Sequence, residues 1–321
     1  MRAVRSAAAR PAGRVALAEA AVVTEWAGSA LVCACADGSV VADGHPLACH
    51  PPGPGVVTAL AWGRGREPAS IDHRGTVRAG ASLQCLGGWG RRLWWSGPGR
   101  LVAVTSEGIH AGPPGGLVPL VGDLGHVREA CLLPARRLAV GTADGVAFVD
   151  HERGSVDGRR TDSMACALTL SASGEVLAVG AASGSVHVVN LESGDGVEIE
   201  GYGVPLRLLA WCGSHLAVGA GRDVTAWPVT AEGGVPADEP VPVCRGDAPV
   251  TALASPPSAA VVAAGDGAGT VRLAAPGGDG GPLFAVALPA PVVNLAWSAD
   301  GSRLAAACAD GGVHRFDVAL G

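Results

Sequence analysis

The sequence predicts an all-β protein made of many short strands, and three observations point to this class. Hydrophobic residues make up 48% of the 321 residues and charged residues 16%, so most of the chain can be buried and wholesale disorder is excluded. The 49 glycines and 23 prolines interrupt the chain too often for long helices. The third observation is an internal repeat, which predicts how the strands are grouped.

Each copy of the repeat begins with an apolar strand, crosses a short turn and continues in a second strand that ends at a tight turn. In the last copy the three successive strands are PVVNLAW, RLAAACA and GVHRFDV. The turn after the second strand recurs eight times at intervals of 33 to 47 residues, with a mean of 39. The eight turns fall at Gly38, Gly75, Gly108, Gly145, Gly184, Arg222, Gly269 and Gly311.

This period predicts the four-stranded antiparallel blades of a β-propeller. Asp-Gly turns between apolar runs favour tight hairpins, because the turn glycine supplies the positive φ that such hairpins require. Helical solenoids have a similar period, but no copy contains 11 residues at helical spacing that are free of Gly and Pro. The helical alternative is therefore rejected.

Eight copies predict eight blades in a single domain over residues 1–321, with seven blades as the alternative because the second and third copies are short. The copies span 21–55, 56–90, 91–126, 127–163, 164–204, 205–248, 249–290 and 291–321. The last copy ends after its third strand, and RVALAE at 14–19 precedes the first copy. We therefore expect strand 14–19 to complete the last blade and close the ring, since an open sheet edge is thereby removed.

The copies resemble the WD-repeat (WD40) family over nearly the whole chain. The family's Asp-Gly turn is kept at Asp37-Gly38, Asp144-Gly145 and Asp310-Gly311, and is shifted at Asp72 and Asp266. The Trp-Asp pair that ends the third strand is mostly replaced: Phe316-Asp317 is its nearest equivalent, and Trp227 is followed by Pro228.

The resemblance implies that some blades contain a hydrogen-bonded set of His, Ser or Thr, Asp and Trp. Only the fourth copy offers most of it, as His126, Thr142 and Asp144, with Val149 in the place of the Trp. We therefore expect a partial network in this blade and stabilisation by packing in the other seven.

Five tryptophans occupy one equivalent position near the end of the first strand: Trp26, Trp62, Trp95, Trp211 and Trp297. A position that recurs in register predicts an aromatic side chain packed between neighbouring blades rather than a ligand contact. Trp89 and Trp94 fall outside this register and are more open to a binding role.

Composition and charge exclude several partners. The net charge of −6 and the scattered arginines give no basic stripe, so nucleic acid is not an expected partner. No stretch approaches the roughly 18 consecutive apolar residues of a membrane span, and the nine cysteines lie singly rather than in a dense disulfide framework. We expect a cytoplasmic monomer without membrane contact. The absence of Lys, with abundant Ala and Gly, is typical of a high-GC bacterial genome.

No catalytic, metal or cofactor site is predicted. Cys33 and Cys35 share a strand face, and Cys49/His50 and Cys212/His215 are neighbours, but zinc requires four converging ligands. No nucleophile and base stand at a recognisable spacing. GDGAG and GPPGG resemble phosphate loops in composition only, because no Lys is present and no helix follows.

The expected functional surface is the rim formed by the loops that enter the first strands and the turns that follow the second strands. Binding faces of repeat proteins are assembled from loops on one side. The rim residues are His73, Arg74, Glu107, His126, Arg128, Arg207, Arg222, Asp223, Asp247 and Asn294. We expect a non-enzymatic scaffold that binds a protein or peptide there. The alternative is a propeller enzyme, or a cofactor- or metal-binding protein, with its site in the central channel.

Overall fold

The computed structural model describes residues 4, 6–47, 55–62, 68–121, 124–160, 163–237, 239–257, 259–278 and 281–321, apart from the side chains of residues 158–160. All regular structure in these residues is β-strand. In the same residues, no helix is long and apolar enough to span a bilayer. The chain divides into a first compact unit, Met1–Leu31 with Thr169–Gly321, and a second compact unit, Val32–Leu168.

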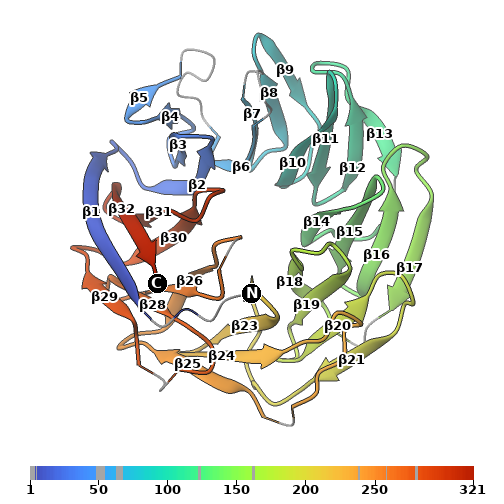
Figure 1. Ribbon diagram of the computed structural model, residues 1–321. Helices are drawn as coiled ribbons and strands as arrows, with labels where there is room; N and C mark the ends of the chain where they lie inside the picture. The colour runs from blue at the N-terminus through green and yellow to red at the C-terminus, as the bar shows by residue number, and fades with distance from the viewer. Residues whose placement is uncertain are drawn as a thin grey trace. The chain divides into compact units, whose positions relative to one another are not determined.

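The strands form eight four-stranded antiparallel sheets, coloured from blue to red along the chain in Figure 1. The first four sheets consist of β2 (Ala21–Ala27), β3 (Ala30–Cys35), β4 (Val40–Ala42) and β5 (His45–Pro46); β6 (Val57–Ala61), β7 (Ala69–Asp72), β8 (Thr76–Ala79) and β9 (Ser82–Cys85); β10 (Gly90–Gly97), β11 (Arg100–Thr105), β12 (Gly108–Gly112) and β13 (Val118–Val121); and β14 (Glu129–Leu133), β15 (Arg137–Thr142), β16 (Gly145–Asp150) and β17 (Val156–Arg160).

The next three sheets consist of β18 (Ala165–Leu170), β19 (Val176–Ala181), β20 (Val186–Asn190) and β21 (Gly196–Ile199); β22 (Leu208–Cys212), β23 (His215–Ala220), β24 (Asp223–Pro228) and β25 (Val241–Arg245); and β26 (Val250–Ala254), β27 (Val262–Asp266), β28 (Thr270–Ala274) and β29 (Phe284–Ala287). The eighth contains β30 (Val292–Trp297), β31 (Arg303–Cys308), β32 (Gly312–Leu320) and β1 (Ala7–Ala16). The prediction of eight blades is confirmed, and the alternative of seven is wrong.

Each of the eight predicted turns joins the second and third strands of a sheet, with Gly108 and Gly145 as the first residues of β12 and β16. Gly75 shows why glycine is needed there: its φ is 72°, and a Cβ atom would stand 2.3 Å from the carbonyl oxygen of Gly87. Asp72 supports the same turn, because its Oδ1 accepts hydrogen bonds from the amides of Arg74 (2.8 Å) and Thr76 (2.9 Å). The shifted aspartates of the sequence therefore still fold their turns through side-chain to backbone bonds.

The strand that completes the eighth sheet is β1, which lies beside β32 in Figure 1 and pairs with it from Ala7 opposite Leu320 to Ala16 opposite Gly312. The expectation of strand 14–19 was correct in role and wrong in bounds. The segment AAARPAG contains Pro and Gly, which argue against a strand. At a sheet edge, however, Pro needs no ladder donor, and a register shift between Pro11 and Gly13 accommodates both residues.

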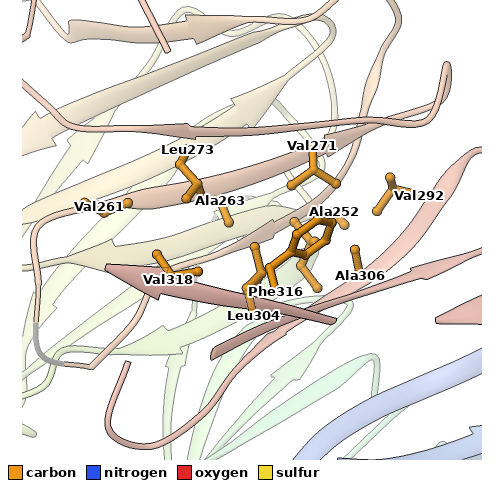
Figure 2. Close-up of a cluster of buried hydrophobic side chains, with 11 residues drawn as sticks. Ala252, Val261, Ala263, Val271, Leu273, Val292, Leu304, Ala306, Phe316 and Val318 are labelled. Atoms are coloured by element: carbon orange, nitrogen blue, oxygen red, sulfur yellow. The ribbon is translucent and has the colours of Figure 1, made fainter. Parts of the chain in front are cut away.

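Apolar side chains of neighbouring sheets pack against one another. In Figure 2, Phe316 and Leu304 of the eighth sheet lie against a group of small side chains that includes Ala263 and Val271 of the seventh. The Phe316 ring also meets that of Phe284 edge-on, with 6.4 Å between centroids. Burial of this kind is the main stabilising contribution in a domain that consists of packed sheets.

Indole side chains join neighbouring first strands at one end. The N–H groups of Trp26, Trp211 and Trp297 donate to carbonyl oxygens of the preceding first strand, at 3.1, 3.1 and 3.4 Å; the acceptors are Ala296, Thr169 and Ala254 respectively. Trp95 packs into the core between the second and third sheets. The predicted packing role is confirmed for these four, whereas Trp62 is 39% exposed.

Side chains at bulges join the sheets at the other end of the first strands. The register shifts between Val250 and Ala252 in β26, and Thr251 at this shift donates to the carbonyl of Val292 in β30 (2.5 Å). In β10, Arg91 at the equivalent shift donates to the carbonyl of Val127 (3.2 Å). Bulges redirect a side chain out of the normal strand alternation, and here they create bonds between sheets.

A hydrogen-bonded set stabilises the sixth sheet, where packing alone was expected. The indole N–H of Trp227 donates to the hydroxyl of Tyr202 (2.7 Å), which is hydrogen-bonded to the Thr225 hydroxyl (2.8 Å). Burial raises the pKa of Tyr202, and the hydrogen bonds from Thr225 and Trp227 only partly oppose this effect. The Tyr202 hydroxyl thus accepts the hydrogen bond of the Trp227 indole N–H, whereas the set of the WD40 family consists of His, Ser or Thr, Asp and Trp.

Deletion of residues 1–16 is expected to abolish cooperative unfolding or to cause aggregation, because the whole edge of β32 loses its partner. Thermal unfolding followed by circular dichroism, with size-exclusion chromatography, measures both effects. Arg10→Ala, an exposed position on β1, is the control that retains the strand. A soluble deletion variant with unchanged melting temperature would contradict the role given to β1.

Tyr202→Phe is expected to destabilise the protein by about 1–3 kcal/mol, because the buried indole N–H of Trp227 loses its acceptor. Urea unfolding measures the loss. Trp227→Phe combined with Tyr202→Phe supplies the test: the two losses should be far from additive, since the double variant no longer contains the indole donor that Tyr202→Phe leaves unsatisfied. Additive losses would show that the two side chains act independently.

Candidate functional site

In the first unit, turns between second and third strands alternate with loops that enter first strands. We call the first rim residues 17–20, 182–184, 200–207, 221–222, 246–249, 267–269, 288–291 and 309–311. Backbone hydrogen bonds join successive members. Gly246 N donates to Arg222 O (2.7 Å), Gly267 N to Pro249 O (3.0 Å) and Leu17 N to Gly311 O (3.0 Å). These bonds fix the backbone of the turns and loops that they join.

The second unit has a surface of the same construction. We call the second rim residues 73–75, 86–89, 106–107, 124–128 and 143–144. Leu86 N donates to Gly75 O (3.0 Å), Ser106 N to Trp89 O (2.7 Å) and Val127 N to Ser106 O (3.0 Å). The backbone groups of both rims are largely engaged within the protein, so side chains remain for recognition.

The predicted rim residues are distributed over both units. His73, Arg74, Glu107, His126 and Arg128 lie on the second rim, and Arg207, Arg222 and Asp247 lie on the first. Two residues lie beyond the loops: Asp223 is the first residue of β24, and Asn294 is half-buried inside β30, where the register shifts after Val292. Whether any of them contacts a partner stays a prediction.

Arginines engage several acids on the first rim and directly beside it. Arg245 reaches both carboxylate oxygens of Asp223, at 3.0 and 3.2 Å. Arg272 is almost buried and bridges Asp247 (2.5 Å) to the buried Asp266 (2.6 Å). Burial raises the pKa of Asp266, but hydrogen bonds from the Thr270 amide, Arg272 and the Ala268 amide outweigh it and hold the pKa below its usual range. These ion pairs fix the turn that begins at Asp266.

Two arginines of the first rim differ from Arg245 and Arg272 in that they form no ion pair within the described residues of this unit. Arg207 and Arg222 are exposed, and no acid pairs with either side chain in the part of the first unit that the structure describes. The carbonyl of Arg222 holds the loop at Gly246, so its backbone is fixed while its guanidinium is available to a partner.

The second rim carries an exposed aromatic side chain, Trp89, with 49% of its surface accessible. Its ring meets the His73 ring edge-on, at 5.5 Å between centroids. His73 is itself held, because its Nδ1 accepts a hydrogen bond from Val56 N (2.9 Å). The sequence marked Trp89 as outside the packing register but did not place it on the rim, since the loop before β10 contains no charged residue that would have drawn attention.

The partial network expected in the fourth sheet does not include its histidine. The Thr142 hydroxyl accepts from Asp144 N and donates to Gly145 O, both at 3.3 Å. His126 is exposed, and the structure describes no hydrogen bond from it to Thr142 or Asp144. Val149 is fully buried among apolar side chains. With no indole to satisfy, nothing holds His126 in the sheet.

Three of the cysteines that the sequence singled out are core residues. Cys33, Cys35 and Cys212 are buried, and burial raises the pKa of Cys212 to about 12. Among the described residues no group of three or more His, Cys, Asp or Glu side chains is placed to hold a metal ion. Cys49 and His50 lie outside the described residues.

A cavity of about 480 Å³ lies in the first unit, at the end of the strands opposite the first rim. Trp211, His215, Val229, Ala260 and Pro276 form much of its wall. Among the described residues no carboxylate or arginine lines it, and burial lowers the pKa of His215. The Ser214 hydroxyl lies 3.5 Å from Nδ1 of His215, and no acid of the described residues is paired with this imidazole.

Comparison with known proteins found one family match within the chain and several similar structures. Residues 287–317, from the end of β29 into β32, match the family described as "WD domain, G-beta repeat". No curated protein matches the chain. The structure is similar to the computationally designed Ika8 protein (TM-score 0.73, 20% identity, 94% of this chain and 97% of that one).

It is also similar to BamB from Moraxella catarrhalis (TM-score 0.75, 16% identity, 97% of this chain and 100% of that one). At these identities the two structures establish the fold alone. Together with the eight sheets, they show that the chain has the fold of an eight-bladed β-propeller, and residues 287–317 of its last sheet match a WD repeat.

Stability is expected to fall as the pH decreases through 6.5. Burial lowers the pKa of four histidines, His110, His151, His215 and His314, below the ordinary value of 6.5. Between the lowered values and 6.5 the unfolded chain binds more protons than the folded chain, so the free energy of unfolding rises with pH in this window and levels off above it.

Urea unfolding at pH 5.5, 6.5 and 7.5 measures this dependence. His151 is 3% exposed, and His151→Gln should reduce the slope because one of the four groups no longer titrates. Leu133→Ala, a buried apolar substitution in the same unit, should lower stability without changing the slope. A free energy of unfolding that is constant over this range would contradict the expectation.

Proposed function

We propose that this chain is a non-enzymatic scaffold that binds a protein or peptide through side chains of its rims. The observation that carries the proposal is the combination of fixed rim backbones with exposed, unpaired side chains, such as Arg207 and Arg222. Because the backbone is ordered before binding, little conformational entropy is lost when a partner docks. Arginine and tryptophan are also the residues that most often dominate binding energies at interfaces.

The repeat architecture supports the same role. Each sheet contributes one turn and one loop to a rim, so several blades present side chains to a single partner. A cytoplasmic location and the absence of a nucleic-acid partner stay predictions from the sequence; the net charge of −6 supports the second.

The double substitution Arg207→Glu with Arg222→Glu is expected to remove partners that the wild-type chain captures. Affinity purification of each tagged protein from the native organism, followed by quantitative mass spectrometry, measures the difference. The double substitution Arg10→Glu with Arg153→Glu is a matched control, because it changes the charge equally at exposed positions on β1 and in the turn after β16. Identical sets of captured proteins for all three chains would contradict binding at the first rim.

A further inference from the structure

The cavity of about 480 Å³ in the first unit, which we call the base cavity, has the size of a site for a small molecule or for a few side chains. The fifth, sixth and seventh sheets all contribute to its wall, through Ser173, Ser214, Thr230, Ala260 and Pro276. The Trp211 ring in the same wall is held by the bond from its N–H to Thr169 O (3.1 Å). The base cavity is therefore bounded by a fixed aromatic ring and by loops at one end of the strands.

Two connections that are longer than the repeat requires lie at the base cavity. The third and fourth strands are joined by residues 229–240 in the sixth sheet and 275–283 in the seventh, whereas the fifth sheet uses only 191–195. The start of the longest connection is fixed, because Val229 N donates to Ser214 O (2.8 Å). Long connections in a compact domain are usually functional.

The N-terminal segment of the chain reaches the base cavity. Val4 is part of the wall and also packs against the apolar core shared by the seventh and eighth sheets. The chain is anchored directly after this contact, because Gly321 N donates to Ser6 O (3.0 Å). The sequence around Val4 is MRAVR, so two arginines, Arg2 and Arg5, flank this apolar residue. Both arginines lie outside the described residues.

The loops at this end of the fifth, sixth and seventh sheets are acidic. Together they contain seven Asp or Glu residues and no Arg, Lys or His. They are residues 171–175, 191–195, 213–214, 229–240, 255–261 and 275–283. Opposite charge for these acids must therefore come from another segment of the chain or from a partner.

Two of these acids lie next to the wall of the base cavity. Glu175 is two residues from Ser173, and Glu232 is two residues from Thr230. Both are exposed, and no arginine pairs with either in the part of the first unit that the structure describes. The Glu232 amide and the Thr230 hydroxyl bond to the Glu232 carboxylate and lower its pKa, so this group stays ionised.

We propose that the base cavity is the docking site of the chain's own N-terminal segment, residues 1–5, with Val4 as the apolar anchor and the two flanking arginines paired with acids at the mouth such as Glu175 and Glu232. The wall itself contains no carboxylate or arginine among the described residues, so it fits the apolar part of the segment, and the acidic loops around it fit the arginines.

The segment is then an intramolecular ligand of a site that is separate from the rims. A short tether gives such a ligand an effective concentration on the order of millimolar. A partner that enters the base cavity must displace it, and the same walls and charges would select the same pattern, an apolar side chain between two basic ones.

A free peptide of sequence MRAVRS, labelled with fluorescein at its C-terminus, tests the site by fluorescence anisotropy. The full-length variant Arg2→Glu with Arg5→Glu should bind the peptide at least tenfold more tightly than the wild type, because the acids repel the altered segment and leave the base cavity open. Binding to this variant should weaken as salt increases, since the attraction is screened. A peptide of sequence MEAVES should not bind.

Substitutions at the mouth locate the binding. Glu175→Lys with Glu232→Lys, added to the Arg2→Glu with Arg5→Glu chain, should weaken binding at least tenfold, because the peptide is then repelled. Glu19→Lys with Glu200→Lys is the matched control, since it makes the same charge change at exposed positions of the first rim in the same unit and should leave binding unchanged.

Val4→Asp in the full-length chain is a second way to release the segment, and it keeps the test valid if the arginine variant fails to fold. It should also bind the peptide at least tenfold more tightly than the wild type. Equal binding by the wild type and both released variants overturns the proposal, as does absence of binding to both. An equal loss of binding in the first-rim control, or equal binding of MEAVES, overturns the assignment to the acidic mouth of the base cavity.

Discussion

β1 and β32 pair side by side along almost their whole length, and the rest of the first unit depends on this contact. It covers the edge of β32 and brings Leu17 to the turn at Gly311. The chain then enters β2, where Trp26 donates to Ala296 and stacks under the guanidinium of Arg303, 4.3 Å from the ring centroid. Without β1, the last sheet would present an unpaired strand and the first sheet would lose this connection.

The links between sheets determine which groups are free to bind a partner. Indole N–H groups join first strands at one end, and bulge side chains such as Thr251 join them at the other. On the rims, backbone donors and acceptors are used by the neighbouring turn or loop. A partner therefore meets side chains on a fixed backbone, so specificity depends on residue identity at positions that the fold itself does not require.

The two rims have the same backbone construction and different chemistry. At the first rim, Arg272 forms ion pairs with both Asp247 and Asp266, so these charges are engaged within the protein. On the second rim, Trp89 is exposed beside Arg74 and Arg128. Most of the charged residues that the sequence assigned to a rim lie in its turns and loops, because they follow the turn register, and their contact with a partner stays a prediction. It could not show which charges are paired, because Asp247 and Arg272 come from different loops and strands.

The sequence by itself predicted eight sheets, with seven as the alternative, and the position of the turns between second and third strands. Both depend on local geometry: glycine permits positive φ, and a short aspartate folds its own turn. Only the tertiary structure decided that β1 begins at Ala7, that Tyr202 satisfies Trp227, and that His126 stays in solvent. Each of these depends on contacts between segments far apart in the chain or on the absence of a buried donor, and neither leaves a periodic signal in the sequence.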